Sequence, residues 1–202
     1  MNTAGLILAG GNSSRIEGHK FQLRLGALPL LDHSAQRLSG QVDCVAVNLP
    51  NGCGWQNKTV LYEPESASGG VGPLAGVLVG LNWAKSVGAQ ALVTVPVDVP
   101  FFPADMVQVL SQAVAGSAPV CAVQSGRRHG LCSLWPVACL LEFAEIFTER
   151  KVRTVNKMLD MLSVTEVTIE GESPPPFFNI NTAGDLEKAE KFLKESSKHE
   201  CI

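Results

Sequence analysis

The chain has 202 residues, of which 46% are hydrophobic and 17% are charged, and its formal net charge at pH 7 is −3. A single core usually serves ~100–200 residues, so the whole chain, residues 1–202, is expected to form one domain. The charge balance provides no broad basic surface for a nucleic acid, and no run reaches the ~18 apolar residues of a membrane span, which argues against both partners.

Runs of apolar and β-branched residues alternate along the chain with segments of helical length. The runs predict strands at residues 4–8, 44–47, 60–62, 91–95, 120–123, 131–135 and 164–169. The segments between them predict helices at residues 30–38, 74–85, 104–115, 137–147, 152–162 and 183–194. Most of these strands are too apolar to be half exposed. The alternation therefore predicts a three-layer, Rossmann-like α/β fold, with a mostly parallel, twisted sheet and helices on both faces.

The first strand leads directly into a glycine-rich loop at residues 10–20. Gly10 and Gly11 let backbone amides converge on phosphate oxygens, while Arg15 and Lys20 supply positive charge, so the loop suits a nucleoside triphosphate. The loop matches neither the Walker pattern GxxxxGK[ST] nor the dinucleotide pattern GxGxxG, which argues against a Rossmann oxidoreductase. On these residues alone, an ordinary strand-to-helix turn with solvated charges is the alternative.

Asp98 lies just beyond the carboxyl end of the expected strand at residues 91–95. Ligands of open α/β sheets bind at that edge. Pro96 and Pro100 stiffen the turn, so the carboxylate is presented in a fixed direction, as a hard octahedral cation requires. We therefore predict that Asp98 binds Mg²⁺, and the alternative is that it caps the next helix.

The six cysteines form no CxxC pair, and four of them lie within apolar runs. Free cysteines are commonly small buried hydrophobes, so the pattern favours unreactive thiols in a reducing compartment over a zinc site or disulfides. The first residues carry no basic segment ahead of their apolar run, which favours a cytoplasmic location. The polar tail, residues 195–202, is expected to fray.

Four segments, in the same order, resemble the nucleotidyltransferases related to molybdenum cofactor guanylyltransferase. LAGGNSSR followed by Lys20 is similar to the family signature LAGGxSxRxGxxK, and the others are GPLAG at 72–76, VPVDVPF at 95–101 and NINT at 179–182 with Asp185. The resemblance implies a fold like that of nucleotide-diphospho-sugar transferases and Mg²⁺-dependent transfer of GMP from GTP to molybdopterin, with release of pyrophosphate. It also implies transient contact with other cofactor-synthesis or acceptor proteins.

The resemblance assigns roles to individual residues. It implies catalytic roles for Arg15, Lys20 and Asp98, with Asp98 as the metal ligand. The residues expected to contact the nucleotide are Leu8, Ala9, Gly10, Gly11, Ser13, Lys20, Asn48, Glu65, Pro73, Leu74, Gly76 and Asp98. Asn179 and Asn181 are expected to bind the acceptor, because their amides would point to one side of an extended segment.

Two residues depart from the family signature, since Glu17 and His19 stand where glycine and aspartate are usual. An inward Glu17 carboxylate would repel a triphosphate, so we expect it to point to water. A cytidylyltransferase acting on molybdopterin, a related enzyme with another phosphorylated acceptor and a nucleotide-binding regulator that has lost catalysis are the alternative functions.

Two further polar groups have open interpretations. Asp185 follows Thr182 by three residues, a spacing that suits a helix-start cap as well as a functional carboxylate. Arg127, Arg128 and His129 form a basic cluster before the expected strand at residues 131–135. This cluster is either a solvated turn or a site for the phosphorylated acceptor.

Overall fold

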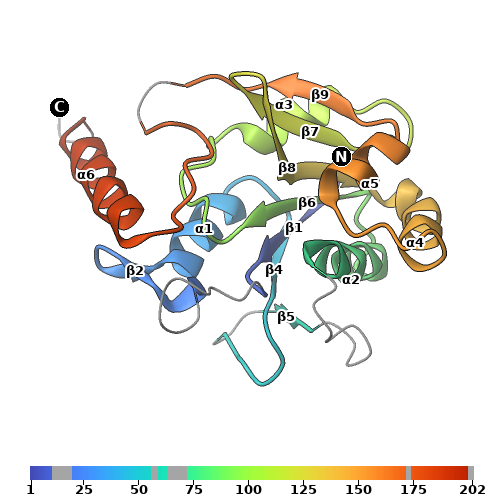
Figure 1. Ribbon diagram of the computed structural model, residues 1–202, viewed down its shortest axis with the longest axis horizontal. Coiled ribbons are helices and arrows are strands. Elements are labelled where there is room, and N and C mark those ends of the chain that lie inside the picture. Colours follow the sequence, from blue (N-terminus) through green and yellow to red (C-terminus); the bar gives the residue numbers. More distant parts are fainter. Residues whose placement is uncertain (11–19, 56–58, 63–71, 172–173, 200–202) are drawn as a thin grey trace.

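The computed structural model describes residues 1–10, 20–55, 59–62, 72–171 and 174–199. Its centre is a seven-stranded sheet with strand order β5-β4-β1-β6-β8-β7-β9 (Figure 1). The strands are β1 (Thr3–Leu8), β4 (Cys44–Asn48), β5 (Thr59–Leu61), β6 (Ala91–Pro96), β7 (Val120–Gln124), β8 (Arg127–Pro136) and β9 (Thr165–Thr168). A separate pair, β2 (Arg24–Leu25) and β3 (Leu28–Pro29), is antiparallel.

The sheet is mostly parallel, as predicted. β5, β4, β1 and β6 pair in parallel, and β7 pairs in parallel with β9. Only β8 runs against its neighbours in this sheet, because a two-residue turn, Ser125-Gly126, reverses the chain after β7. Both turn residues have positive φ, 48° and 74°, which matches the twist of a tight hairpin.

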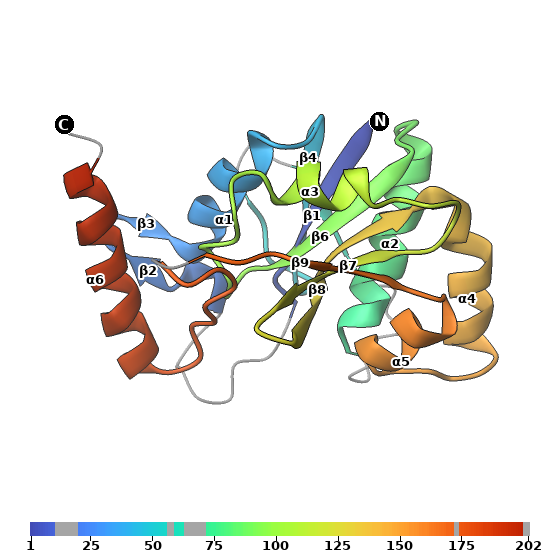
Figure 2. The same ribbon diagram turned by 90° about the horizontal axis from the view of Figure 1, so that it is seen from above.

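Helices cover both faces of the sheet, which gives the predicted three layers (Figures 1 and 2). One hydrophobic cluster includes residues of α1 (Leu30–Ser39) and α3 (Met106–Gln112). The cluster on the other face includes residues of α2 (Pro73–Ser86), α4 (Leu140–Thr148) and α5 (Val155–Met161). The last helix, α6 (Ala183–His199), lies beside β2 at one end of the molecule (Figure 2). None of the helices in the described ranges has the length and apolar character that a membrane crossing requires.

The central strands are buried because they are covered on both faces. Every residue of β1 is buried, as are the first five residues of β6. Their mostly apolar sequences are therefore the signature of a sandwiched strand, and both strands were predicted within one residue at each end. The thiols of Cys121, Cys132 and Cys139 are buried and free.

Several predicted boundaries need correction. β8 begins at Arg127, so the basic cluster lies within a strand and not in a turn before it. The helix predicted at 137–147 is divided into the 3-10 turn η3 (Val137–Cys139) and α4. α5 begins only at Val155, because Thr154 is extended with φ −98° and ψ 136°. α3 is shorter than the predicted 104–115, and α6 is longer than the predicted 183–194.

α2 packs unusually close to the sheet because two of its residues are glycines. A Cβ atom on Gly80 would lie 2.9 Å from Leu92 Cδ2, and one on Gly76 would lie 2.6 Å from Asn48 Oδ1. Real Cβ atoms do not approach other atoms so closely. Gly76 therefore lets the start of α2 lie against the carboxyl ends of β1 and β4, and Gly80 lets the middle of the helix lie against β1 and β6.

Candidate active site

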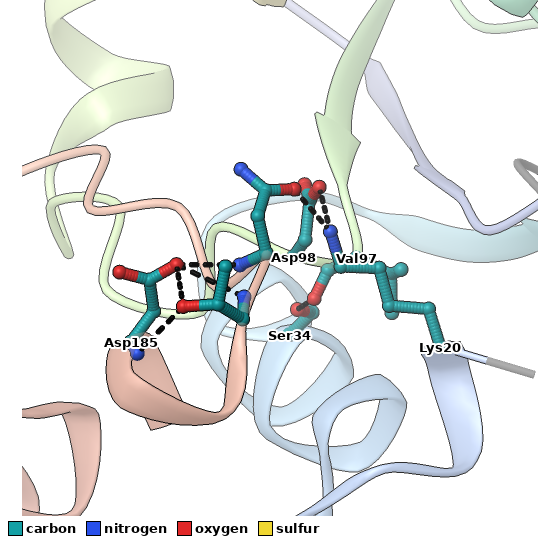
Figure 3. A network of polar contacts seen from close by, with 7 residues as sticks. Lys20, Ser34, Val97, Asp98 and Asp185 are labelled. Atoms are coloured by element: carbon teal, nitrogen blue, oxygen red, sulfur yellow. Dashed lines mark hydrogen bonds and ion pairs between the residues drawn. The ribbon is translucent and has the colours of Figure 1, made fainter. Parts of the chain in front are cut away.

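Asp98 lies two residues beyond the end of β6, at the carboxyl edge of the parallel strands. The backbone around it is fixed by hydrogen bonds from Val97 N–H to the Leu8 carbonyl, at 3.0 Å, and from Val99 N–H to the Pro96 carbonyl, at 3.2 Å. Ser34 Oγ, on α1, lies 3.5 Å from the Val97 carbonyl (Figure 3). The turn is thus tied to β1 and α1, and it holds the carboxylate at the edge where ligands of such sheets bind.

Lys20 connects three distant segments at this edge. It lies in the 3-10 turn η1 (Lys20–Gln22), and its Nζ atom is 2.7 Å from Asp98 Oδ2 (Figure 3). The same Nζ atom donates to Asn181 Oδ1, also at 2.7 Å. The side chains of Lys20 and Asp98 are only 13% and 18% exposed. The fold therefore concentrates an ammonium, a carboxylate and an amide oxygen in a partly desolvated place.

The second carboxylate oxygen of Asp98 has no hydrogen-bond partner. Asp98 Oδ1 is buried, and it is the single such side-chain atom without a partner in the described part of the chain. Leaving a buried acceptor unsatisfied costs roughly 1–3 kcal/mol, and more for a charged group. Carboxylate and amide oxygens are the donors that hard divalent cations prefer. Asp98 Oδ1 with the nearby Asn181 Oδ1 thus fits the chemistry of a metal ligand set.

The segment that carries Asn179 and Asn181, residues 177–182, is here called the C-terminal arm. Ile180 is fully buried within it, and the Ile180 N–H donates to the Asp98 carbonyl at 2.8 Å. Both asparagines are exposed, as expected when they alternate with a buried residue. Asn181 accepts a hydrogen bond from Lys20, and Asn179 is exposed on the same arm.

Asp185 holds the end of the C-terminal arm. Its Oδ2 atom accepts hydrogen bonds from the N–H groups of Asn181, at 3.1 Å, and Thr182, at 3.0 Å, and from Thr182 Oγ1, at 2.9 Å. The Asp185 N–H donates to Thr182 Oγ1, which completes a capping box at the start of α6. The Thr182 hydroxyl, followed by the Asn181 N–H, lowers the pKa of Asp185. Asp185 therefore acts on the site through the backbone of Asn181.

The predicted nucleotide contacts lie at the ends of β1 and β4 and at the start of α2. Gly10 and Pro73 are exposed. The buried members of the set are Leu8, Ala9, Asn48, Leu74 and Gly76. The Asn48 amide donates to the Leu61 carbonyl at 3.3 Å, and its oxygen fills the space beside Gly76. The predicted contacts Gly11, Ser13, Arg15 and Glu65, with the departures Glu17 and His19, lie outside the described residues.

The basic cluster of β8 is divided among different surroundings. Arg128 forms ion pairs with Asp160, at 2.5 Å, and with Glu166, at 2.6 Å, and these carboxylates raise its pKa. Arg127 is exposed, and the ring of His129 stacks on Phe177. The charge of Arg128 is thus already compensated by α5 and β9, which favours the interpretation of Arg128 as part of a surface network.

Comparison with known proteins places this geometry in a family. Residues 5–163 match the MobA-like NTP transferase domain. The chain is 38% identical to the molybdenum cofactor guanylyltransferase of Rhizobium leguminosarum bv. trifolii (strain WSM2304), over 95% of this chain and 93% of that protein. It is 34% identical to the molybdenum cofactor guanylyltransferase of Rhodobacter capsulatus, over 98% of this chain and 100% of that protein.

A solved structure has the same fold. The molybdopterin-guanine dinucleotide biosynthesis protein A from Archaeoglobus fulgidus superimposes with a TM-score of 0.74 at 19% identity, over 95% of this chain and 99% of that one. At this identity the likeness concerns the fold alone. The family match, which covers most of the chain, and the two relatives above 30% identity show that this chain belongs to the MobA-like NTP transferase domain family.

Proposed function

We propose that this protein transfers a guanylyl group from GTP to molybdopterin and releases pyrophosphate. The observation that carries the proposal is the cluster of Lys20, Asp98 and Asn181 at the carboxyl edge of the sheet, in which Lys20 is the last residue of the glycine-rich loop. The two relatives above 30% identity are both named molybdenum cofactor guanylyltransferase, which supports this choice of donor and acceptor.

The side chains of the cluster suit a reaction between phosphates. The ammonium of Lys20 stands at the edge where the triphosphate would lie, so it can stabilise the negative charge that develops as pyrophosphate departs. An acceptor phosphate is already ionised near neutral pH, because its second pKa is about 6, and it needs no general base. Positioning and electrostatic stabilisation can then supply most of the catalysis, as in phosphoryl transfer.

We propose that Asp98 holds a divalent cation, Mg²⁺ by preference, with Asn181 nearby. The unpartnered, buried Oδ1 atom of Asp98 supports this assignment, because Lys20 takes up only Oδ2. A bound Mg²⁺ would neutralise charge on the reacting phosphates. Lys20 sets the local charge beside Asp98, and Asn179 and Asn181 are proposed to contact the acceptor.

The remaining roles follow from the family signature. We propose that Arg15, Gly10, Gly11 and Ser13 contact the triphosphate. Leu8, Ala9, Asn48, Glu65, Pro73, Leu74 and Gly76 are proposed to surround the nucleotide. At the buried positions of this set, contact would come mainly from the backbone. We also propose that the chain acts as one domain in the cytoplasm and passes its product to other cofactor-synthesis or acceptor proteins by transient contact.

The decisive experiment is a pyrophosphate-release assay of the purified protein with Mg²⁺ and molybdopterin. GTP, CTP, ATP and UTP are compared, each with and without molybdopterin, and thermal stability is measured with each nucleotide. We expect release with GTP that depends on molybdopterin. A preference for CTP would reassign the base. Stabilisation by nucleotide without any release would indicate a binding protein and would refute the proposed transfer.

A further inference from the structure

The pairing of β7 with β8 contains an irregularity next to the candidate site. Cys121 pairs with Ser133 and Val123 pairs with Arg128, so residues 129–132 of β8 face Ala122 alone. Extra residues of this kind bend a strand and change the direction of its side chains, and they are common beside active sites. His129 is the first residue of this irregular stretch of β8.

The irregular stretch follows the paired part of β6 and β8. The last pair between these antiparallel strands is Thr94 with Ser133, two residues before β6 ends at Pro96. The residues of β8 before Ser133 thus extend past this last pair, in the direction of the turn that holds Asp98. Gly130 faces α5, since a Cβ atom there would lie 2.8 Å from Val155 Cγ1. His129, the preceding residue, stacks instead on the C-terminal arm.

The ring of His129 stacks on that of Phe177, with ring centroids 4.5 Å apart and an angle of 24° between the planes. Phe177 is the first residue of the C-terminal arm and is only 3% exposed. Its φ is +61°, in the left-handed region that bulky residues rarely adopt. Such a conformation persists only where the surroundings impose it, and residues held in this way cluster at functional sites.

The ring of His129 is one of several contacts that hold the C-terminal arm. The others include the hydrogen bond from the Ile180 N–H to the Asp98 carbonyl, at 2.8 Å, and the hydrogen bond from Lys20 Nζ to Asn181 Oδ1. The ring of Phe178 packs edge-to-face on Phe192, and Asp185 caps Asn181 and Thr182. The His129 contact lies at the start of the arm, where the strained backbone has to be held in place.

We propose that His129 is a positioning residue for the nucleotidyl transfer. Through its stack on Phe177 it fixes the C-terminal arm so that Asn179 and Asn181 lie at the edge that carries Asp98. The inference rests on the proposed function for the identity of the reaction, whereas the fixing of the arm is a property of the fold. The flat ring at position 129 is what matters, so another aromatic residue should replace it.

The test compares His129→Ala with the matched variant His129→Phe, which keeps a flat ring. The structural readout is hydrogen exchange of the Ile180 amide by NMR, with the Ala9 amide, which donates to the Asn48 carbonyl at 3.0 Å, as the internal reference. We expect His129→Ala to speed exchange at Ile180 at least about tenfold and to leave Ala9 unchanged. His129→Phe should restore slow exchange.

The kinetic readout separates positioning from general destabilisation. His129→Ala should lower kcat for guanylyl transfer about tenfold or more, because a small displacement of a reacting group is costly, while KM for GTP changes little. His129→Phe should recover most of kcat. Unchanged exchange at Ile180 in His129→Ala, or equal loss in both variants, would overturn the inference. Absence of transfer by the wild type would refute the proposed function, and faster exchange in His129→Ala would still support the fixing of the arm.

Discussion

Lys20 and Asp98 are separated by 78 residues in the sequence, yet Lys20 Nζ lies 2.7 Å from Asp98 Oδ2. The contact joins the end of the glycine-rich loop to the turn after β6. Asn181, from the far end of the chain, accepts from the same ammonium. Because each oxygen belongs to a segment anchored by its own backbone hydrogen bonds, the geometry is set before any substrate binds.

Replacing Asp98 by asparagine should lower turnover at least ~100-fold, the scale typical of losing a key electrostatic group. The change keeps the size of the side chain but removes the charge opposite Lys20, so the protein should still fold. Turnover at saturating GTP and the circular dichroism spectrum are the measurements. Asp105→Asn, which alters an exposed carboxylate at the start of α3, is the matched control and should stay near wild type. Near-normal turnover in folded Asp98→Asn protein would place the metal elsewhere.

Replacing Lys20 by methionine should have opposite effects on catalysis and on metal binding. Loss of the ammonium should lower kcat and raise KM for GTP, because the charge on departing pyrophosphate grows in the transition state. Binding of Mn²⁺ without nucleotide, followed by electron paramagnetic resonance, should tighten at least ~3-fold, because like charges near 4 Å repel by roughly 1–4 kcal/mol. A change in KM alone would make Lys20 a ground-state binding group. Weaker Mn²⁺ binding would contradict the expectation that the Lys20 ammonium opposes a cation on Asp98.

The sequence predicts the strands that carry this site better than it predicts the contacts between the side chains of the site. β1 and β6 are recognisable because they are mostly apolar, and a carboxylate after a buried strand belongs at the ligand-binding edge. The contact between Lys20 and Asn181 depends on the return of the chain over 161 residues, which local patterns do not encode. The stack of His129 on Phe177 depends on an irregular strand pairing and a left-handed Phe177, and phenylalanine gives no sign of that backbone conformation.

Replacing Gly76 by alanine should destabilise the protein by about 1–3 kcal/mol, the usual cost of overpacking. The new Cβ atom would lie 2.6 Å from Asn48 Oδ1 and 2.8 Å from Leu8 Cδ2, and the Asn48 amide is already held by the Leu61 carbonyl. Urea denaturation measures the free energy of unfolding. Gly40→Ala is the control, because φ there is −77° and nothing lies within 4 Å of the added atom. Equal stability of the two variants would show that α2 can shift away from the sheet.

Replacing Asp185 by asparagine should reduce the pH dependence of stability in acid. The pKa of Asp185 is lowered in the folded protein, mainly by the Thr182 hydroxyl and then by the Asn181 N–H. The ionised Asp185 therefore contributes fully to the free energy of unfolding at pH values above the carboxyl pKa of about 3.9 in the unfolded chain. This contribution is lost as the pH falls through the lower pKa of Asp185 in the folded protein. Urea midpoints of the wild type and Asp185→Asn should differ at pH 7 and converge in strong acid. A difference that stays constant across this range would mean that the charge of Asp185 is irrelevant.

His129 should make the folded protein less stable as the solution becomes mildly acidic. Burial, and then the neighbouring charge of Arg127, lowers the pKa of His129. The unfolded chain, in which the imidazole has its ordinary pKa of about 6.5, therefore binds a proton before the folded protein does. The free energy of unfolding is therefore not reduced by His129 above about pH 6.5, and it declines as the pH falls toward the lower pKa of His129 in the folded protein.

The variant His129→Phe removes the titrating group but keeps a flat ring against Phe177. Its urea midpoint should therefore fall less than that of the wild type between about pH 7 and 5. The same variant should keep the slow exchange of the Ile180 amide at both pH values, because a phenyl ring cannot be protonated. If the urea midpoints of the two proteins fell in parallel, groups other than His129 would govern the pH dependence of stability in this range.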